Sequence, residues 1–210
     1  MVLTMYRNSE GYADPTAGAA LGNIRREERR KKKLDRHIQG RRSRAFGEIF
    51  ETRIGHALDR YADLDVACIQ KTPEPFRVIR NIGNGRFEGF YEKKGQPDFK
   101  GCLCDGTAIV FEAKHTDSDR IQQSVVTDMQ TFYFNKYEKL GARCYVMVSL
   151  GLSTFYRVPW DVWKGMKEKF GHKYMNADDL QLYKLKETNG FIQLLEGIEL
   201  KGEDNEDTES

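Results

Sequence analysis

Alternating side chains mark two neighbouring segments as the strands of a hairpin. In the apolar run Thr107–Ala113 and the lysine after it, successive residues face opposite sides, with Glu112 and Lys114 on the same side. A shorter apolar run begins at Asp98, and an Asp-Gly turn at 105–106 separates the two runs. Because a hairpin brings its far ends together, Asp98 is expected to lie near Glu112.

Helical spacing of apolar residues predicts a first helix from about Arg44 to Tyr61. Its buried stripe consists of Phe46, Ile49, Phe50, Ile54, Ala57, Leu58 and Tyr61. A second helix is predicted from about Asp119 to Leu140, capped by Ser118. Its buried side is marked by Ile121, Val125, Met129 and Phe132. Strands are predicted at 144–149 and 154–158, and this order of elements suits an α/β fold with a mixed sheet flanked by helices.

Two carboxylates and an ammonium group at one point suit the binding of Mg²⁺ and the cleavage of a phosphodiester. Mg²⁺ prefers oxygen ligands, which Asp98, Glu112 and the carbonyl of Ala113 would supply. The metal acidifies a bound water and neutralises charge that develops in the transition state. Lys114 would orient or deprotonate that water, or bind the phosphate. On an exposed strand, Glu112 and Lys114 would instead form a surface pair of little energetic worth.

The first helix offers a third carboxylate. At 100° per residue, Glu51 falls about 100° from the centre of the buried stripe, whereas Glu48 falls about 160° away. A carboxylate that reaches a metal beside the core should lie at the edge of the stripe, so we predict Glu51. The alternative is an ordinary glutamate at the boundary of the core.

The pattern P-D…E-A-K resembles that of the PD-(D/E)xK nucleases, which share the restriction-endonuclease-like fold. Within this superfamily the chain resembles the RecU-type Holliday junction resolvases of Gram-positive bacteria and their phages. The resemblance covers roughly residues 41–158 and depends on four segments: G-E-I-F-E (47–51), I-Q-K-T-P-E-P (69–75), D-F-K-G (98–101) and F-E-A-K-H-T (111–116). Pro97 departs from the family pattern, because these resolvases commonly have a threonine there. Glu74 likewise replaces a usual threonine.

The resemblance implies a restriction-endonuclease-like core in which Asp98, Glu112 and Lys114 form the catalytic set. The same alignment selects Glu51 on the first helix. It also places a glutamine of the second helix near the metal, for which Gln130 is the candidate and Gln122 and Gln123 are alternatives. The implied enzyme is a homodimer that uses Mg²⁺, or Mn²⁺ in its place, to cut four-way DNA junctions symmetrically. A strand-exchange recombinase is a possible further partner.

A glycine-rich and basic insertion lies at about 80–95, with a hairpin signal at Asn84-Gly85. In the resolvases that the chain resembles, a projecting β-hairpin stalk occupies this place and enters the junction. Its candidate DNA contacts are Arg80, Arg86, Lys93 and Lys94, and its aromatic residues would pack or stack on opened bases. The alternative is a β-meander whose aromatic residues belong to the core.

The net charge of +2 conceals a strong asymmetry along the 210 residues. The segment 25–44 is heavily basic, and the segment 196–210 is acidic. Basic blocks near a chain end often bind nucleic acid, so Arg41, Arg42 and Arg44 are candidate DNA contacts. We therefore expect a basic, partly disordered arm at 1–40, a nuclease domain at 41–195 and an acidic disordered tail at 196–210.

Two further residues are candidate DNA contacts: Lys71 in the I-Q-K-T-P-E-P segment and His115 directly after Lys114. A solvent-facing His115 without a DNA contact is the alternative. The four cysteines include no C-x-x-C pair, which argues against structural zinc. With no membrane-spanning segment and no signal-peptide pattern, a cytoplasmic, nucleoid-associated location is expected.

Two other functions are compatible with these residues. The first is an endonuclease of the same fold that acts on flaps or linear duplex DNA. The second is a DNA-binding recombination accessory protein without catalytic activity, although the intact set of Asp98, Glu112 and Lys114 argues against it.

Overall fold

The computed structural model describes residues 15–91 and 95–198, with side chains from residue 25 onward. The chain divides into two units, residues 1–44 and 45–210, and helix α1 (Pro15–Asp63) contributes to both. Of the predicted acidic tail at 196–210, only residues 196–198 are described. No helix in the described ranges is both long and apolar enough to cross a membrane.

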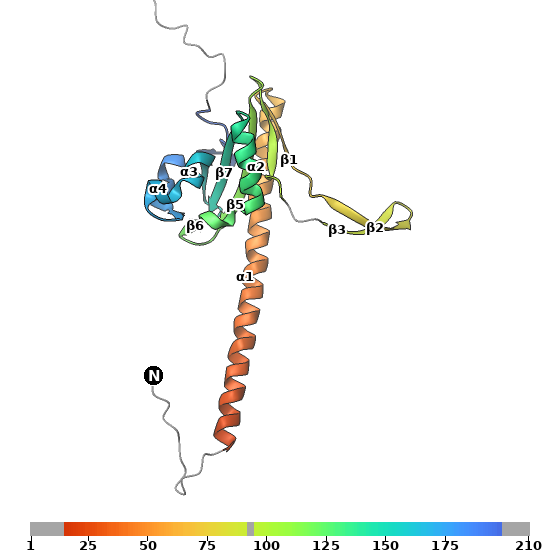
Figure 1. The fold of residues 1–210 in the computed structure, drawn as a ribbon, viewed down its shortest axis with the longest axis vertical. Coiled ribbons are helices and arrows are strands. Elements are labelled where there is room, and N and C mark those ends of the chain that lie inside the picture. The colour runs from red at the N-terminus through yellow and green to blue at the C-terminus, as the bar shows by residue number, and fades with distance from the viewer. Residues whose placement is uncertain (1–14, 92–94, 199–210) are drawn as a thin grey trace, which may run out of the picture. The chain divides into compact units, whose positions relative to one another are not determined.

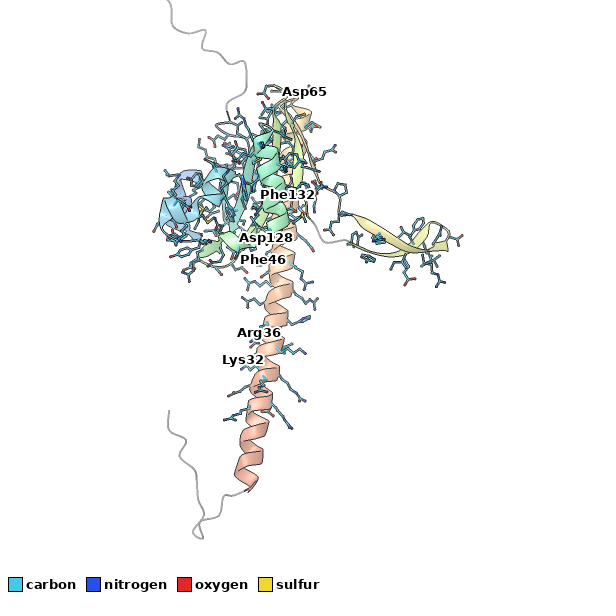
Figure 2. All side chains as sticks on the ribbon, viewed as in Figure 1. Lys32, Arg36, Phe46, Asp65, Asp128 and Phe132 are labelled. Carbon is cyan, nitrogen blue, oxygen red and sulfur yellow. The ribbon has the colours of Figure 1, made fainter. Side chains whose placement is uncertain are left out.

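The first unit consists, where it is described, of the N-terminal part of α1. The predicted helix start near Arg44 is wrong, because α1 begins at Pro15. The buried stripe used for that prediction is missing from this part: residues 25–39 are all exposed, including Leu34 and Ile38. Lys32 and Arg36 are among its exposed basic side chains (Figure 2). Arginine, lysine and glutamate are good helix formers, which is consistent with a helix without a packed face.

The second unit contains a mixed five-stranded sheet (Figure 1). Its strands are β1 (Ala67–Lys71), β4 (Phe99–Leu103), β5 (Ala108–Thr116), β7 (Arg143–Leu150) and β8 (Thr154–Pro159), in the order β1-β4-β5-β7-β8. β5 and β7 pair in parallel, and the other neighbours pair antiparallel. The predicted strands at 144–149 and 154–158 are thus confirmed.

The predicted hairpin is formed by β4 and β5, which pair with Phe99 opposite Phe111. Its turn contains Gly106 with a φ of +77°, a conformation that glycine adopts without strain. Asp105 fixes the turn by accepting hydrogen bonds from the backbone N–H and the hydroxyl of Thr107, both at 2.8 Å. One step beyond Phe99 and Phe111, this register places Asp98 opposite Glu112.

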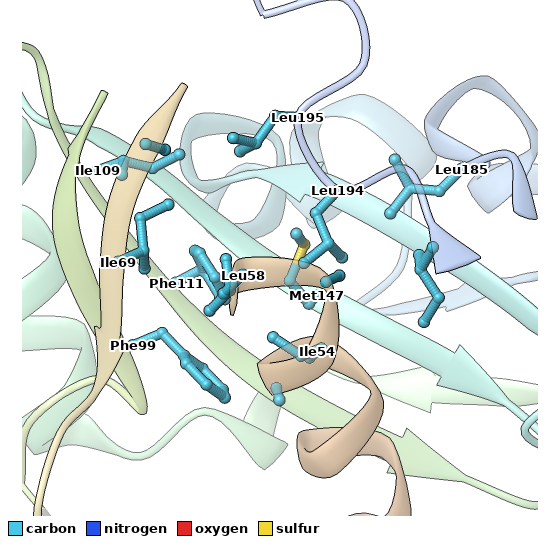
Figure 3. Packing of buried hydrophobic residues seen from close by; sticks show 14 of the residues in the cluster. Ile54, Leu58, Ile69, Phe99, Ile109, Phe111, Met147, Leu185, Leu194 and Leu195 are labelled. Atoms are coloured by element: carbon cyan, nitrogen blue, oxygen red, sulfur yellow. The ribbon is translucent and has the colours of Figure 1, made fainter. Parts of the chain in front are cut away.

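One face of the sheet is covered by the C-terminal part of α1 (Figure 3). Phe50, Ile54 and Leu58 of the helix pack with strand residues such as Phe99 and Phe111, and the two phenylalanines stack at 5.0 Å. Full burial of such a side chain contributes about 1.5–3 kcal/mol. The helix stripe matches the prediction except at Ile49, which is 46% exposed.

The other face of the sheet packs against α2 (Asp128–Lys139) and α3 (Trp160–Lys164). This second core contains Phe134, Trp160 and Trp163 with the strand residues Val110, Cys144, Val146, Val148 and Val158. α4 (Met166–Phe170) and α5 (Ala177–Leu180) add Met166 and Leu180. Helices thus lie on both faces of the mixed sheet, as predicted.

The prediction for the second helix is wrong at its beginning and in its buried side. The helix starts at Asp128 with Thr127 as its N-cap, not near Asp119. Before it, β6 (Arg120–Gln122) pairs with β9 (Tyr174–Asn176), and a 3₁₀ turn spans Gln123–Val125. Ile121 is buried, but from a strand, whereas Val125, Met129 and Phe132 are 37%, 54% and 52% exposed. The apolar stripe predicted the wrong buried side of the helix. The inward positions of α2 are occupied by a polar residue, Gln130, in the first turn and by Phe134 one turn later.

Short elements complete the second unit. A 3₁₀ turn at Gln181–Tyr183 leads to β10 (Glu187–Thr188), which pairs with β11 (Phe191–Ile192). The segment after β11 returns to the core that α1 covers, where Ile192, Leu194 and Leu195 are buried. This segment therefore completes that core.

The predicted insertion is a hairpin of β2 (Phe76–Gly83) and β3 (Arg86–Tyr91). Both residues of its Asn84-Gly85 turn have positive φ, as this dipeptide predicts. In the described residues these strands pair only with each other, and all their side chains are exposed. The alternative of a β-meander that fills the core is therefore wrong. The hairpin begins at Phe76, four residues earlier than the predicted 80.

Candidate active site

The two carboxylates predicted to meet lie together on the α2 side of the sheet. Asp98 is 4% and Glu112 1% exposed. The backbone N–H of Asp98 donates to Glu112 Oε2 at 3.0 Å, and the backbone N–H of Ala113 donates to Asp98 Oδ2 at 3.1 Å. Each carboxylate is therefore held by the main chain of the neighbouring strand. The alternative of a solvated strand face is wrong for Glu112.

The other oxygen of Glu112 accepts hydrogen bonds from two side chains. Lys114 Nζ donates to Glu112 Oε1 at 2.6 Å, and Gln130 Nε2 donates to the same oxygen. Lys114 remains 22% exposed, so its ammonium group combines a buried contact with access from solvent. The structure thus brings together Asp98, Glu112, Lys114 and Gln130. Gln122, one of the two alternative glutamines, is exposed, and Gln123 donates to the main chain of α3.

The orientation of the Gln130 amide follows from the cap of α2. The backbone N–H of Thr127 donates to Gln130 Oε1 at 3.0 Å, and the Thr127 hydroxyl donates to it at 3.1 Å. The hydroxyl in turn accepts from the backbone N–H of Gln130, which completes a capping box. Because its oxygen is occupied by these donors, Gln130 presents its NH₂ group to Glu112. Gln130 therefore donates a hydrogen bond that orients the Glu112 carboxylate.

Burial and a neighbouring like charge disfavour the ionised form of Glu112. The pKa of Glu112 is raised to about 7. Burial is the main cause and the nearby Asp98 carboxylate is the second, whereas Lys114 lowers this pKa. With this raised pKa, a further positive charge beside Glu112 would favour its ionised form.

Glu51 lies apart from this pair. It projects from α1, which covers the opposite face of the sheet, and its Oε2 forms an ion pair with Lys71 Nζ at 2.7 Å. Within the described residues, no three histidine, cysteine or carboxylate side chains form a metal-binding cluster. The structure therefore does not group Glu51 with Asp98 and Glu112. Glu51 is half-buried and Glu48 exposed, as the helical projection predicts.

The predicted DNA contacts fall into several groups. Arg41, Arg42 and Arg44 are exposed on α1 within the first unit. Arg80 and Arg86 are exposed on the β2–β3 hairpin, and Lys71 is exposed at the end of β1. Lys93 and Lys94 lie outside the described residues. For all of these residues the contact with DNA remains a prediction.

The His115 ring is buried, whereas a DNA contact and a solvent-facing position would both require an accessible ring. Its side chain is only 2% exposed. Nδ1 lies 3.3 Å from Ser149 Oγ, Nε2 lies 3.2 Å from Asp117 Oδ1, and the ring meets Phe46 edge-on. The solvent-facing alternative is therefore wrong, and the ring offers little surface to DNA. Its predicted DNA contact stays a prediction.

Two threonines that the sequence analysis missed contact the residues of the site. Thr127 fixes the Gln130 amide, and Thr72 bonds to the carbonyl oxygens of Pro97 and Asp98. The T-x-x-Q spacing at 127–130 is a capping-box signature and could have been found. Thr72 has no such signature, because its partners are main-chain atoms 25 and 26 residues away along the chain.

Comparisons with known proteins place the chain in a family. The family model for RecU, recombination protein U, matches residues 45–200. The chain belongs to the RecU family. This membership confirms the predicted resemblance to Holliday junction resolvases and identifies a nuclease of DNA recombination and repair. Together with the mixed sheet between helices, it also confirms the predicted fold class.

Other comparisons add little to the RecU match. A solved structure of Hjc, a Holliday junction resolvase from the archaeal hyperthermophile Archaeoglobus fulgidus, is similar at 13% identity and a TM-score of 0.39. The similarity covers 65% of this chain and 93% of Hjc. A comparison with curated proteins finds no similar sequence. The assignment to the RecU family therefore rests on the match over residues 45–200.

Proposed function

We propose that this protein resolves four-way DNA junctions by Mg²⁺-dependent hydrolysis at the Asp98–Glu112 site. The observation that carries this proposal is the buried pair of carboxylates, which meets an ammonium group on a chain of the RecU family. A purely structural role would leave two acids buried together at a cost in stability that ordinary core residues avoid.

The residues present fit a hard divalent cation. Asp98 and Glu112 supply carboxylate oxygens, the donor type that Mg²⁺ and Mn²⁺ prefer, and two backbone hydrogen bonds hold them side by side. The carbonyl of Ala113 would add a third oxygen. Glu51 is a candidate for a further ligand, for which it would have to leave Lys71. When bound here, the ion would polarise the scissile phosphate and acidify a water.

Three side chains of the protein would prepare the attack on the phosphate. Gln130 and Lys114 both donate to Glu112 Oε1 and hold this carboxylate in one orientation. The exposed part of Lys114 would place its ammonium group beside the attacking water or the phosphate. Asp98 is held by the main chain of β5, so its carboxylate does not have to be ordered when DNA binds.

Phosphate contacts would come from the exposed basic residues. Arg80 and Arg86 on the hairpin, and the arginines of α1 at 41, 42 and 44, face solvent. Neutralisation of phosphates releases counterions, so junction binding should weaken strongly with salt. The exposed Phe87, Phe90 and Tyr91 of the hairpin suit stacking on bases that are unpaired at the centre of a junction.

Symmetric cleavage requires two sites. A two-fold homodimer would present one Asp98–Glu112 site to each of two strands of like polarity, which gives paired nicks. A strand-exchange recombinase is a suitable functional partner, because strand exchange produces the four-way junctions that this site would consume.

The decisive experiment is cleavage of a labelled synthetic four-way junction with and without Mg²⁺, beside a linear duplex of equal length. We expect paired symmetric nicks that require Mg²⁺ and spare the duplex. Asp98→Asn should abolish these nicks and keep junction affinity, because it removes a charged ligand without changing the size of the side chain.

Each other outcome contradicts a specific part of the proposal. Cleavage of the duplex would retain the nuclease and remove the junction specificity. Tight binding without cleavage in Mg²⁺ or Mn²⁺ would leave a DNA-binding protein. Normal cleavage by Asp98→Asn would refute the assignment of the metal site.

A further inference from the structure

Thr72 holds both peptide groups that flank Asp98. Its backbone N–H donates to the carbonyl oxygen of Asp98 at 2.7 Å, and its hydroxyl donates to the carbonyl oxygen of Pro97 at 2.8 Å. The backbone N–H of Asp98, which lies between these two carbonyl groups, donates to Glu112 Oε2. The main chain on each side of the Asp98 side chain is therefore fixed by hydrogen bonds, two of them from one residue.

The hydroxyl of Thr72 supplies a hydrogen bond that the backbone pairing of β1 with β4 does not supply. The pairing of β1 with β4 ends at Lys71 opposite Phe99. One further backbone bond follows, from the Thr72 N–H to the Asp98 carbonyl, and the next residues, Pro73 and Pro97, have no backbone N–H to donate. A side-chain hydroxyl is then the donor that satisfies the Pro97 carbonyl, which belongs to a buried residue. A residue of the same shape without a hydroxyl would leave this carbonyl without that bond.

The Thr72 contacts also lie where the β2–β3 hairpin joins the body of the second unit. The chain enters the segment leading to the hairpin directly after Thr72 and returns through Gly95, Gln96 and Pro97. Between these two connections lies a cavity of about 230 Å³ that is lined by Thr72, by prolines on both sides and by Asp98. Both connections of the hairpin to the body of the second unit therefore pass next to the Thr72 hydrogen bonds.

We propose that Thr72 is a positioning residue for junction cleavage, whose hydroxyl holds the Pro97–Asp98 peptide in place and keeps the Asp98 carboxylate beside Glu112 while the hairpin engages DNA. This inference rests on the proposed function. Thr72 acts through Asp98, so removal of its hydroxyl should affect the chemical step and the binding of metal, and should leave the affinity for DNA unchanged.

The test compares Thr72→Val, which keeps the shape and the backbone N–H, with Thr72→Ser, which keeps the hydroxyl. Thr107→Val is the matched control. Thr107 also donates through its backbone N–H and its hydroxyl, but at the far turn of the β4–β5 hairpin. Three quantities are measured for each protein: the single-turnover cleavage rate of a four-way junction, the junction Kd in EDTA, and the Mg²⁺ concentration that gives half of the metal-induced rise in Tm without DNA.

We expect Thr72→Val to cut at least about tenfold more slowly, in line with the loss of a residue that supports a ligand. Its Mg²⁺ midpoint should rise several-fold, and its junction Kd should stay within twofold of wild type. Thr72→Ser should restore most of the rate and the midpoint. Thr107→Val should keep both, even where its Tm falls.

Three outcomes would overturn the role of Thr72. Thr72→Val could cut and bind Mg²⁺ like wild type, Thr72→Val could lose junction affinity in proportion to its rate, or Thr107→Val could show the same loss of rate. If wild type itself does not cut junctions but Thr72→Val still has a raised Mg²⁺ midpoint, the proposed function fails while the positioning of Asp98 by Thr72 stands.

Discussion

Glu112 should make the metal-free protein less stable as the pH rises. Burial and the adjacent Asp98 raise the pKa of Glu112 from 4.5 to about 7, so the folded state binds this proton more tightly than the unfolded chain. The stabilisation by the bound proton is complete below about pH 4.5 and is lost as the pH rises through about 7. Mg²⁺ should reverse this trend, because it binds the ionised carboxylates.

The size of the effect follows from the shift in pKa. At about 1.4 kcal/mol for each pH unit between the two pKa values, the loss of stability is at most about 3 kcal/mol. For a protein of this size, that corresponds to a fall in Tm of roughly 6–12 °C. Glu112→Gln cannot ionise and should lack this component.

The assay is thermal or urea unfolding in EDTA at several pH values from 4.5 to 8, for wild type and Glu112→Gln. Other groups titrate in both proteins, so the difference between the two profiles isolates Glu112. Glu138→Gln is a suitable control, because Glu138 is paired with Lys164 at the surface. Its profile should follow that of wild type. Parallel profiles for wild type and Glu112→Gln in EDTA would refute the reasoning.

Three further predictions concern the support of the site, the hairpin and the core. Gln130→Leu removes the donor to Glu112 and should lower the cleavage rate about 10- to 100-fold; an unchanged single-turnover rate would contradict the role of the amide. Replacement of Arg80 and Arg86 by alanine should weaken junction binding and reduce the slope of log K against log salt by about 0.9 per lost phosphate contact; a titration with the same slope as wild type would exclude these contacts. Phe111→Ala should cost about 3–5 kcal/mol in urea unfolding, because Phe111 is fully buried.

The sequence predicted the elements whose signal is local. A turn dipeptide located both hairpins, together with strand alternation in the hairpin of β4 and β5, because a tight turn fixes which strands pair. The buried helix stripe was correct between Phe50 and Tyr61, where α1 packs on the sheet. Residues 25–39 of α1 are all exposed, so this part of the helix has no buried stripe for a periodic pattern to reveal.

The second helix shows where periodicity fails. The spacing of Ile121, Val125, Met129 and Phe132 fits one face of a helix, but β6 pairs with β9 from a segment some fifty residues later. That pairing is a tertiary contact, and no local pattern encodes it. The true inward position is taken by Gln130 because its amide is satisfied by Glu112 and Thr127, and a hydrophobicity pattern treats this residue as exposed.

The same reasoning explains why the acids of the site could be found but not the residues that support them. A carboxylate on a strand that is otherwise buried costs free energy unless it has a charged or metal partner, so Glu112 in an apolar run is an exception that invites a functional explanation. Thr72 and Thr127 are threonines next to turns and caps, where threonine is ordinary. Their importance depends on which distant atoms their hydroxyls and N–H groups meet, and only the folded chain determines that. Charged residues in apolar strands are therefore the part of such a site that sequence can identify, while the hydrogen bonds that hold them have to be found in the structure.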